Sequence, residues 1–312
     1  MKKKHIIFVP GKNPKPPENQ HRELLWRTLL EGVRRAEPEL VNEIEKNKAV
    51  FRIVAWNYAY YQHSHDNSRD IPWIDALLNQ HGPTEQDIRE ANSLQVKLTR
   101  FLYTVADLLP WLTRWLPQSA RDTIEETNAY FENRGNIGYE IRGILKRFLR
   151  PLLDSNEEVL VIGHSLGSVI VYDALWELSR NEVHPGKVDF LSLGSPLGLK
   201  FIQNKLQGRQ YPKANRYPAN IRRWINLSSV GDTTAVDRRF SDDFSGMLKY
   251  QLVDSIEDHE KGIYNFYRDE KGLNCHTSYG YLVNPAVGEI ISQWWLRAGE
   301  EPASSIKNNQ SE

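Results

Sequence analysis

EVLVIGHSLGSVIVYDAL, residues 158–175, is the most informative stretch of this chain. It opens with the apolar run Val159–Ile162, which is typical of a strand buried on both faces. From Leu166 onward, apolar residues recur at helical spacing, which predicts a helix over residues 165–180. A G-x-S-x-G pattern centred on Ser165 occupies the junction. The stretch therefore predicts a strand, a sharp turn and a helix, with a serine exposed on the turn.

Similar apolar runs occur on both sides of this unit. We predict strands at Ile6–Val9 and Val50–Trp56 before it, separated by a helix over Gln20–Arg35, and strands at Val188–Leu193 and Arg223–Ser228 after it. Alternating strands and helices indicate an α/β fold with a mainly parallel sheet and helices on both faces. In such sheets the ligand binds at the carboxyl ends of the strands.

The alternation is interrupted by a helical insertion at about residues 58–137. Its apolar stripe runs from Leu94 to Leu112, and a last helix over 138–150 closes at Pro151. Trp111 and Trp115, four residues apart, could form part of a lid or the packing face of a helical pair.

We expect a single α/β domain over residues 1–302, followed by a polar tail at 303–312. Forty basic residues balance forty acidic ones, which argues against a partner such as nucleic acid. No apolar stretch is long enough to span a membrane, and the apolar run near the N-terminus is too short for a secretory signal. The single cysteine, Cys275, cannot form an internal disulfide, so we expect a cytoplasmic protein.

The chemistry of the G-x-S-x-G turn favours Ser165 as a nucleophile. A tight strand-to-helix turn strains the backbone, and glycines on either side let the strand and the helix approach closely. The N–H of Leu166, at the start of the helix, has no acceptor within the helix and could stabilise an oxyanion. The alternative is that Ser165 only caps the helix.

A serine nucleophile needs a base and an acid that orients the base. In this kind of fold the acid and then the histidine follow the serine, which leaves His184, His259 and His276 as candidates for the base. His184 lies at the wrong end of the sheet and His259 lies in a charged stretch, whereas His276 lies on a loop before an apolar helix. The candidates for the acid are Asp232, just beyond a strand, and Asp237.

At these motifs the chain resembles α/β-hydrolase lipases and esterases, particularly soluble bacterial ones. The resemblance covers IIFVPGKN, GHSLG, LSLGSPLG, WINLSSVGDTTAV and HTSYGYL, but not the insertion. In similar proteins an aspartate follows the tryptophan of a W-x-N strand by eight residues, and a late H-x-x-Y opens the last helix. Trp224, Asn226 and Asp232 match the first pattern, while His276 and Tyr279 match the second. The resemblance therefore favours Asp232 over Asp237.

Two departures from the family pattern stand near the site. Pro10-Gly11 replaces the usual His-Gly, and Thr233 replaces the proline that often follows the acid. By position, the second oxyanion donor would be the backbone N–H of Lys12 or Gly11.

Two other clusters contain residue types that occur in binding sites. The segment from His63 to Asp66 has residue types that bind metals, but its spacing is more typical of a polar loop. Basic residues on the helix before Pro151 could contact anionic lipid, although a solvated face is the more ordinary interpretation. These basic residues are Arg142, Lys146, Arg147 and Arg150.

The sequence thus predicts a serine hydrolase that cleaves a small-molecule carboxylic ester through an acyl-enzyme, without a metal or organic cofactor. The alternatives are an acyltransferase, a thioesterase or amidase on the same residues, or an interaction protein that has lost its chemistry. The sequence does not determine the oligomeric state.

Overall fold

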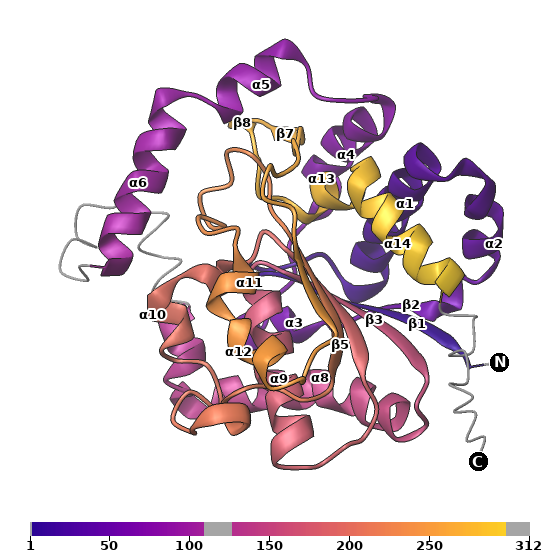
Figure 1. Ribbon diagram of the computed structural model, residues 1–312. Helices are drawn as coiled ribbons and strands as arrows, with labels where there is room; N and C mark the ends of the chain where they lie inside the picture. Colours follow the sequence, from indigo (N-terminus) through magenta and orange to yellow (C-terminus); the bar gives the residue numbers. More distant parts are fainter. Residues whose placement is uncertain (1, 109–126, 298–312) are drawn as a thin grey trace, which may run out of the picture.

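A six-stranded sheet with helices on both faces organises the computed structural model, which describes residues 2–108 and 127–297 (Figure 1). The strand order is β2-β1-β3-β4-β5-β6, and all neighbouring strands are parallel. The strands are β1 (Lys4–Val9), β2 (Phe51–Ile53), β3 (Glu158–His164), β4 (Val188–Leu193), β5 (Ile221–Leu227) and β6 (Ser255–Asp258). The predicted α/β class is therefore confirmed.

Alternate residues of each strand belong to two separate cores. Ile7 packs in the core beneath one pair of helices, whereas its neighbour Ile6 packs in the core beneath the other pair. Because both faces are covered, the strands need apolar residues at successive positions, which explains the continuous apolar runs in the sequence. The covering helices are α1 (Glu18–Ala36) and α14 (Pro285–Arg297) on one face, and α8 (Ile137–Asp154) and α9 (Leu166–Arg180) on the other (Figure 1).

The strand predicted at Val50–Trp56 is shorter in the structure. Val50 closes a 3-10 turn, and Trp56 begins helix α3 (Trp56–Tyr61) instead of ending the strand. The Trp56 indole N–H donates a 2.8 Å hydrogen bond to the carbonyl of Pro10. This bond holds the Trp56 side chain against the turn after β1. Tertiary contact has overridden the β propensity of the aromatic residue.

One other prediction is wrong, and one strand was not predicted. Helix α8 does not end at Pro151 but continues to Asp154, because Leu152 and Leu153 are buried in the core. Strand β6 was not predicted. It is a short edge strand with the sequence SIED, in which Ile256 is the only buried residue, so it lacks an apolar run.

The segment between β2 and α8 contributes helices α4 (Asp70–Asn79), α5 (Glu85–Ala91) and α6 (Leu94–Leu108). Arg268, which begins the short strand β7 (Arg268–Asp269) after β6, forms ion pairs with Asp87 and Glu90 of α5. The Arg100 guanidinium of α6 donates to the carbonyl of Val236, on the loop after β5. This segment therefore packs against the loops that follow β5 and β6. Trp111 and Trp115 lie outside the described residues.

The remaining elements are short. They are α2 (Val41–Lys46), α10 (Lys200–Gln203), α11 (Phe240–Asp243), α12 (Ser245–Lys249) and α13 (Ser278–Leu282), with the hairpin strands β7 (Arg268–Asp269) and β8 (Gly272–Leu273). Within the described ranges, no helix combines the length and the apolar character that crossing a bilayer requires.

Helices α1 and α14 meet through their backbones. A β-carbon at Gly288 would lie 1.9 Å from the carbonyl oxygen of Gly32, far inside van der Waals contact. A β-carbon at Gly32 would lie 2.1 Å from the carbonyl oxygen of Leu282. This face of the sheet is therefore covered at a separation that only glycine permits.

We predict that Gly288→Ala lowers the free energy of unfolding by about 1–3 kcal/mol, because the helices must separate to admit a methyl group. Gly143→Ala on α8 is the matched control, since a β-carbon there meets no atom within 4 Å. The control should raise the stability by roughly 0.5–1 kcal/mol through helix propensity. Urea unfolding measures both values, and equal stabilities for the two variants would contradict this account of the packing.

Candidate active site

Ser165 occupies the turn between the last residue of β3, His164, and the first residue of α9, Leu166. Its backbone has φ 54° and ψ −128°, a conformation that residues with a side chain rarely adopt. Two backbone hydrogen bonds hold Ser165 in this strained conformation. The Ser165 N–H donates a 2.9 Å hydrogen bond to the carbonyl of Leu193, and its own carbonyl accepts from the N–H of Ser168.

The glycines around the serine are required by close backbone approach. A β-carbon at Gly163 would lie 2.6 Å from the Cα of Ser168, and one at Gly167 would lie 2.1 Å from the carbonyl oxygen of Val9. The G-x-S-x-G pattern therefore packs β3, α9 and the end of β1 against each other. The same packing presents the serine hydroxyl beyond the carboxyl end of the sheet.

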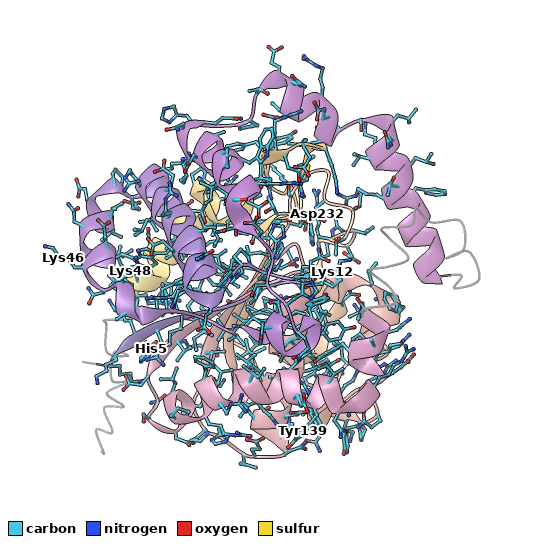
Figure 2. The ribbon with its side chains drawn as sticks, turned by 180° about the vertical axis from the view of Figure 1, so that it is seen from behind. His5, Lys12, Lys46, Lys48, Tyr139 and Asp232 are labelled. Carbon is cyan, nitrogen blue, oxygen red and sulfur yellow. The ribbon has the colours of Figure 1, made fainter. Side chains whose placement is uncertain are left out.

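The order of the strands places a crevice at this point. From β1 the chain continues outward to β2, whereas from β3 it continues to β4 on the opposite side. The loops after β1 and β3 therefore diverge, and such a switch point is where open parallel sheets bind ligands. In Figure 2 the labels of Lys12, just after β1, and Asp232 lie near the middle of the view, whereas His5, near the start of β1, lies toward the left edge.

The structure brings Ser165, His276 and Asp232 together from three distant segments. The His276 Nε2 atom lies 2.9 Å from the Oγ of Ser165, and its Nδ1 atom lies 2.8 Å from the Oδ2 of Asp232. An ionised carboxylate only accepts hydrogen bonds, so Nδ1 carries the proton and Nε2 is left to accept one from the serine hydroxyl. The arrangement can therefore remove a proton from Ser165.

Asp232 is 1% exposed yet well supplied with hydrogen-bond donors. Its carboxylate accepts from His276, from the Tyr281 hydroxyl at 2.6 Å and from the N–H of Thr234 at 2.8 Å. Burial opposes ionisation, but the nearby His276 and these hydrogen bonds outweigh it and hold the pKa of Asp232 below its ordinary value. Asp232 is therefore a buried anion that faces the imidazole.

A second histidine fixes the loop that carries His276. The Nε2 atom of His164 lies 2.6 Å from the carbonyl oxygen of His276, and it must donate because a carbonyl only accepts. Burial, together with the neighbouring His276, places the pKa of His164 well below its ordinary value, so the ring is neutral near pH 7. The backbone N–H of His276 donates a second hydrogen bond, to the side-chain oxygen of Asn274 on the same loop.

The turn after β1 is clamped beside Ser165. A β-carbon at Gly11 would lie 2.8 Å from the Cβ of Ser165, so glycine alone fits there. The side-chain amide of Asn57, on α3, donates to the carbonyls of Gly11 at 2.8 Å and Asn13 at 2.9 Å. Gly11 and Lys12 line the same cleft as Ser165. Leu166, the first residue of α9, directly follows the serine.

The other candidates for the acid, the base and a metal site do not contact Ser165, His276 or Asp232 in the hydrogen bonds of the described residues. Asp237 packs against Gly198 and accepts a hydrogen bond from the N–H of Arg239. His184 pairs with Asp154 at the end of the sheet opposite Ser165, and His259 is exposed at the end of β6. In the segment from His63 to Asp66, His65 pairs with Asp70 at the edge of the cleft.

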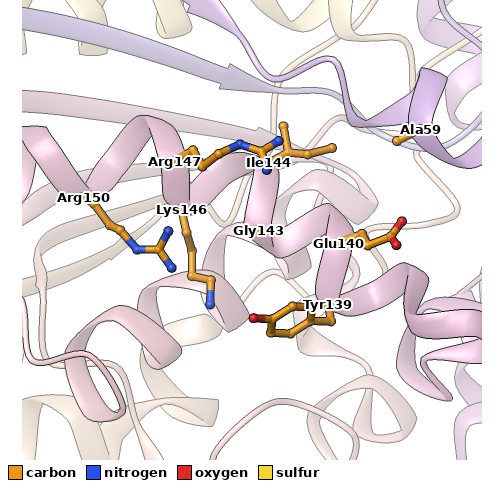
Figure 3. Close-up of a pocket in the computed structure, with 8 residues that line it drawn as sticks. All are labelled: Ala59, Tyr139, Glu140, Gly143, Ile144, Lys146, Arg147 and Arg150. Atoms are coloured by element: carbon orange, nitrogen blue, oxygen red, sulfur yellow. The ribbon is translucent and has the colours of Figure 1, made fainter.

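A cleft of about 570 Å³ opens directly on Ser165 and His276. A separate hollow of about 450 Å³ lies against α8, where Figure 3 shows Lys146, Arg147 and Arg150 with Ala59 of α3. None of the residues that line this hollow belongs to the Ser165 site. Lys146 is itself buried and forms ion pairs with Glu177 of α9 and with Glu182. These ion pairs link α8 to α9 and to the segment that follows α9.

Two residues of this site were missing from the sequence predictions. The resemblance directed attention to Tyr279, but the tyrosine that contacts Asp232 is Tyr281, whose hydroxyl also accepts from the N–H of Ser229. Since α13 is a helix, residues 279 and 281 face different directions. The motif gives no signal for His164, because this residue occupies a variable position of G-x-S-x-G.

Comparisons of the chain with models of known protein families, with curated proteins and with solved structures found no match. The functional interpretation therefore depends on the geometry and chemistry of the site itself.

Proposed function

We propose that this protein is a serine hydrolase that cleaves a carboxylic ester through a covalent acyl-enzyme. The observation that carries the proposal is the continuous hydrogen-bonded chain from the Ser165 hydroxyl through His276 to the buried Asp232. A serine hydroxyl is a weak nucleophile at neutral pH, and such a chain is a means of activating it. The strained turn, the adjoining cleft and the strand topology support the same conclusion.

In the proposed reaction the Ser165 Oγ attacks the ester carbonyl carbon while the His276 Nε2 accepts the hydroxyl proton. The tetrahedral oxyanion is stabilised by the N–H of Leu166 and by the N–H of Gly11 or Lys12. Collapse expels the alcohol, which takes the proton from His276. Water then attacks the acyl-enzyme by the same route, and the carboxylic acid leaves while Ser165 regains its proton.

Asp232 acts on the imidazole and not on the substrate. As a buried anion it fixes the tautomer of His276 and stabilises the imidazolium that forms when the proton moves. The reaction so described needs no metal or organic cofactor. The proposal agrees with the resemblance to α/β-hydrolase esterases. We further propose the cytoplasm as the compartment, since the chain's single cysteine, Cys275, has no partner for an internal disulfide.

We predict that a fluorophosphonate probe labels Ser165 and that Ser165→Ala reduces turnover of p-nitrophenyl acetate on the order of 10⁶-fold. Ser245→Ala, at an exposed serine of α12, is the matched control and should retain both labelling and activity. Peptide mapping locates the label. Full activity in Ser165→Ala would rule out the proposal.

The two candidate aspartates give a second prediction. Asp232→Asn should lower kcat roughly 10⁴-fold, because an amide in place of the carboxylate favours the wrong tautomer of His276. Asp237→Asn makes the same chemical change at a carboxylate that caps a turn, and its kcat should stay within about threefold of the parent. Steady-state kinetics compares them, and the reverse order of effects would assign the acid to Asp237.

Tyr281→Phe removes a hydrogen bond to a charged group and should lower kcat/KM about tenfold. That bond helps to hold the pKa of Asp232 down, so without it Asp232 takes up its proton at a higher pH. The acidic limb of the plot of kcat/KM against pH should therefore move to higher pH.

Tyr264→Phe is the control for this tyrosine. Its hydroxyl is paired with Asn92, outside the site, and the control should keep the parent profile. A lower stability in Tyr281→Phe with an unmoved acidic limb would show that Tyr281 only supports the fold.

A further inference from the structure

The cleft beside Ser165 is enclosed by three loops. They are residues 11–16 after β1, residues 63–70 after α3, and residues 267–279 around the β7–β8 hairpin. The first two loops are joined by a hydrogen bond from the N–H of His65 to the carbonyl of Lys15, at 2.8 Å. With a volume of about 570 Å³, the cleft is of the size that holds a small molecule.

The walls of this cleft are polar. Among the residues that the structure describes, its lining contains no alanine, valine, leucine, isoleucine, methionine, phenylalanine or tryptophan. Pro14 and Pro16 are the prolines of this lining, and Tyr267 and Tyr279 are its tyrosines. A long alkyl chain placed here would gain little apolar contact and would strip water from charged groups. The part of the lining that the structure describes is therefore poorly suited to a fatty acyl chain.

The charges of the lining balance. Within the described ranges it includes three lysines and three aspartates. One aspartate, Asp70, is paired with His65. Burial, together with Lys15, lowers the pKa of His21 to about 3, so this histidine adds no charge at neutral pH. Equal numbers of the two signs give these lysines and aspartates no net charge that would favour an anion or a cation.

The side chains that line the cleft include both hydrogen-bond donors and hydrogen-bond acceptors. Lys271 and Thr277 can donate, and the carboxylates of Asp66 and Asp269 can accept beyond the hydrogen bonds that they already receive within the protein. A hydroxyl group both donates and accepts, so a molecule with several hydroxyls matches such a wall better than an alkyl or a charged group does. The rings of Tyr267 and Tyr279, with centroids 6.2 Å apart, are largely buried and border the cleft at its edge with the core.

A smaller cavity of about 200 Å³ adjoins the cleft near His21. It contains the aliphatic side chains of Ile53 and Ala55, but Ser165 is not part of its lining. An acyl group bound to Ser165 therefore meets the polar cleft before it meets this apolar surface.

We propose that the site takes short-chain acyl esters of neutral polyhydroxylated alcohols, for which an acetylated sugar is the simplest probe. This inference rests on the proposed function. Hydrolysis would transfer the acetyl group to the Ser165 Oγ and release the sugar hydroxyl with the proton from His276. Water would then release acetate and a proton.

The test compares kcat/KM for glucose 6-acetate and cyclohexylmethyl acetate, which are both acetates of a primary alcohol on a six-membered ring. We expect a preference of about tenfold for the sugar ester, equivalent to one well-made hydrogen bond. A preference of at least about fivefold supports the inference, and any smaller or reversed ratio overturns it. p-Nitrophenyl decanoate should be cleaved no faster than p-nitrophenyl acetate, and a faster decanoate would also overturn it.

A variant pair ties the preference to the cleft. Lys271→Leu replaces a lysine of the lining, and Lys261→Leu makes the same change at an exposed lysine outside it. The sugar preference should fall by about threefold or more in Lys271→Leu and stay unchanged in Lys261→Leu. Equal ratios in the two variants would overturn the assignment of the cleft as the binding site.

The two proposals fail differently. If neither p-nitrophenyl acetate nor the fluorophosphonate probe reacts at Ser165, the proposed function itself fails. If both react but the sugar ester has no advantage, the hydrolase proposal stands and only the substrate class is wrong.

Discussion

The contact between His276 and the buried carboxylate of Asp232 is the interaction on which the site depends. A carboxylate that is 1% exposed is costly unless its oxygens are satisfied, and here His276, Tyr281 and the backbone of Thr234 satisfy them. Those hydrogen bonds keep Asp232 ionised, and the anion in turn orients the imidazole. Without this buried charge, nothing in the described site would set the tautomer that leaves Nε2 facing Ser165.

Backbone packing makes that contact possible. Gly11, Gly163 and Gly167 allow the ends of β1 and β3 and the start of α9 to approach closer than a β-carbon permits. The loops after β3, β5 and β8 then converge on one edge of the sheet. His164 adds a link between two of them, since it starts on the serine turn and donates to the carbonyl of the loop that carries His276.

Sequence patterns located most of this arrangement. The apolar runs predicted five of the six strands of the main sheet, because strands covered on both faces need continuous apolar sequence. Ser165, Asp232 and His276 were named from motif and position, and the structure brings them together. Edge strand β6 escaped prediction because it buries a single residue.

Other features depend on contacts between distant segments and leave no local signal. Trp56 ends β2 early because its indole bonds to Pro10, and Asn57 clamps the turn at Gly11 across 46 positions of the chain. The choice of Tyr281 over Tyr279 depends on which face of α13 contacts Ser229 and Asp232, on the loop after β5. The polar character of the cleft arises only when three separate loops meet.

The central claim is that Ser165 carries the acyl group during turnover. Rapid acid quenching of a reaction with p-nitrophenyl acetate, followed by mass spectrometry of the peptides, tests it most directly. The account predicts an acetyl group on the peptide that contains Ser165, and its accumulation should precede steady-state release of acetate. Steady turnover with no acetylated Ser165, or with the acetyl group on another residue, would contradict it.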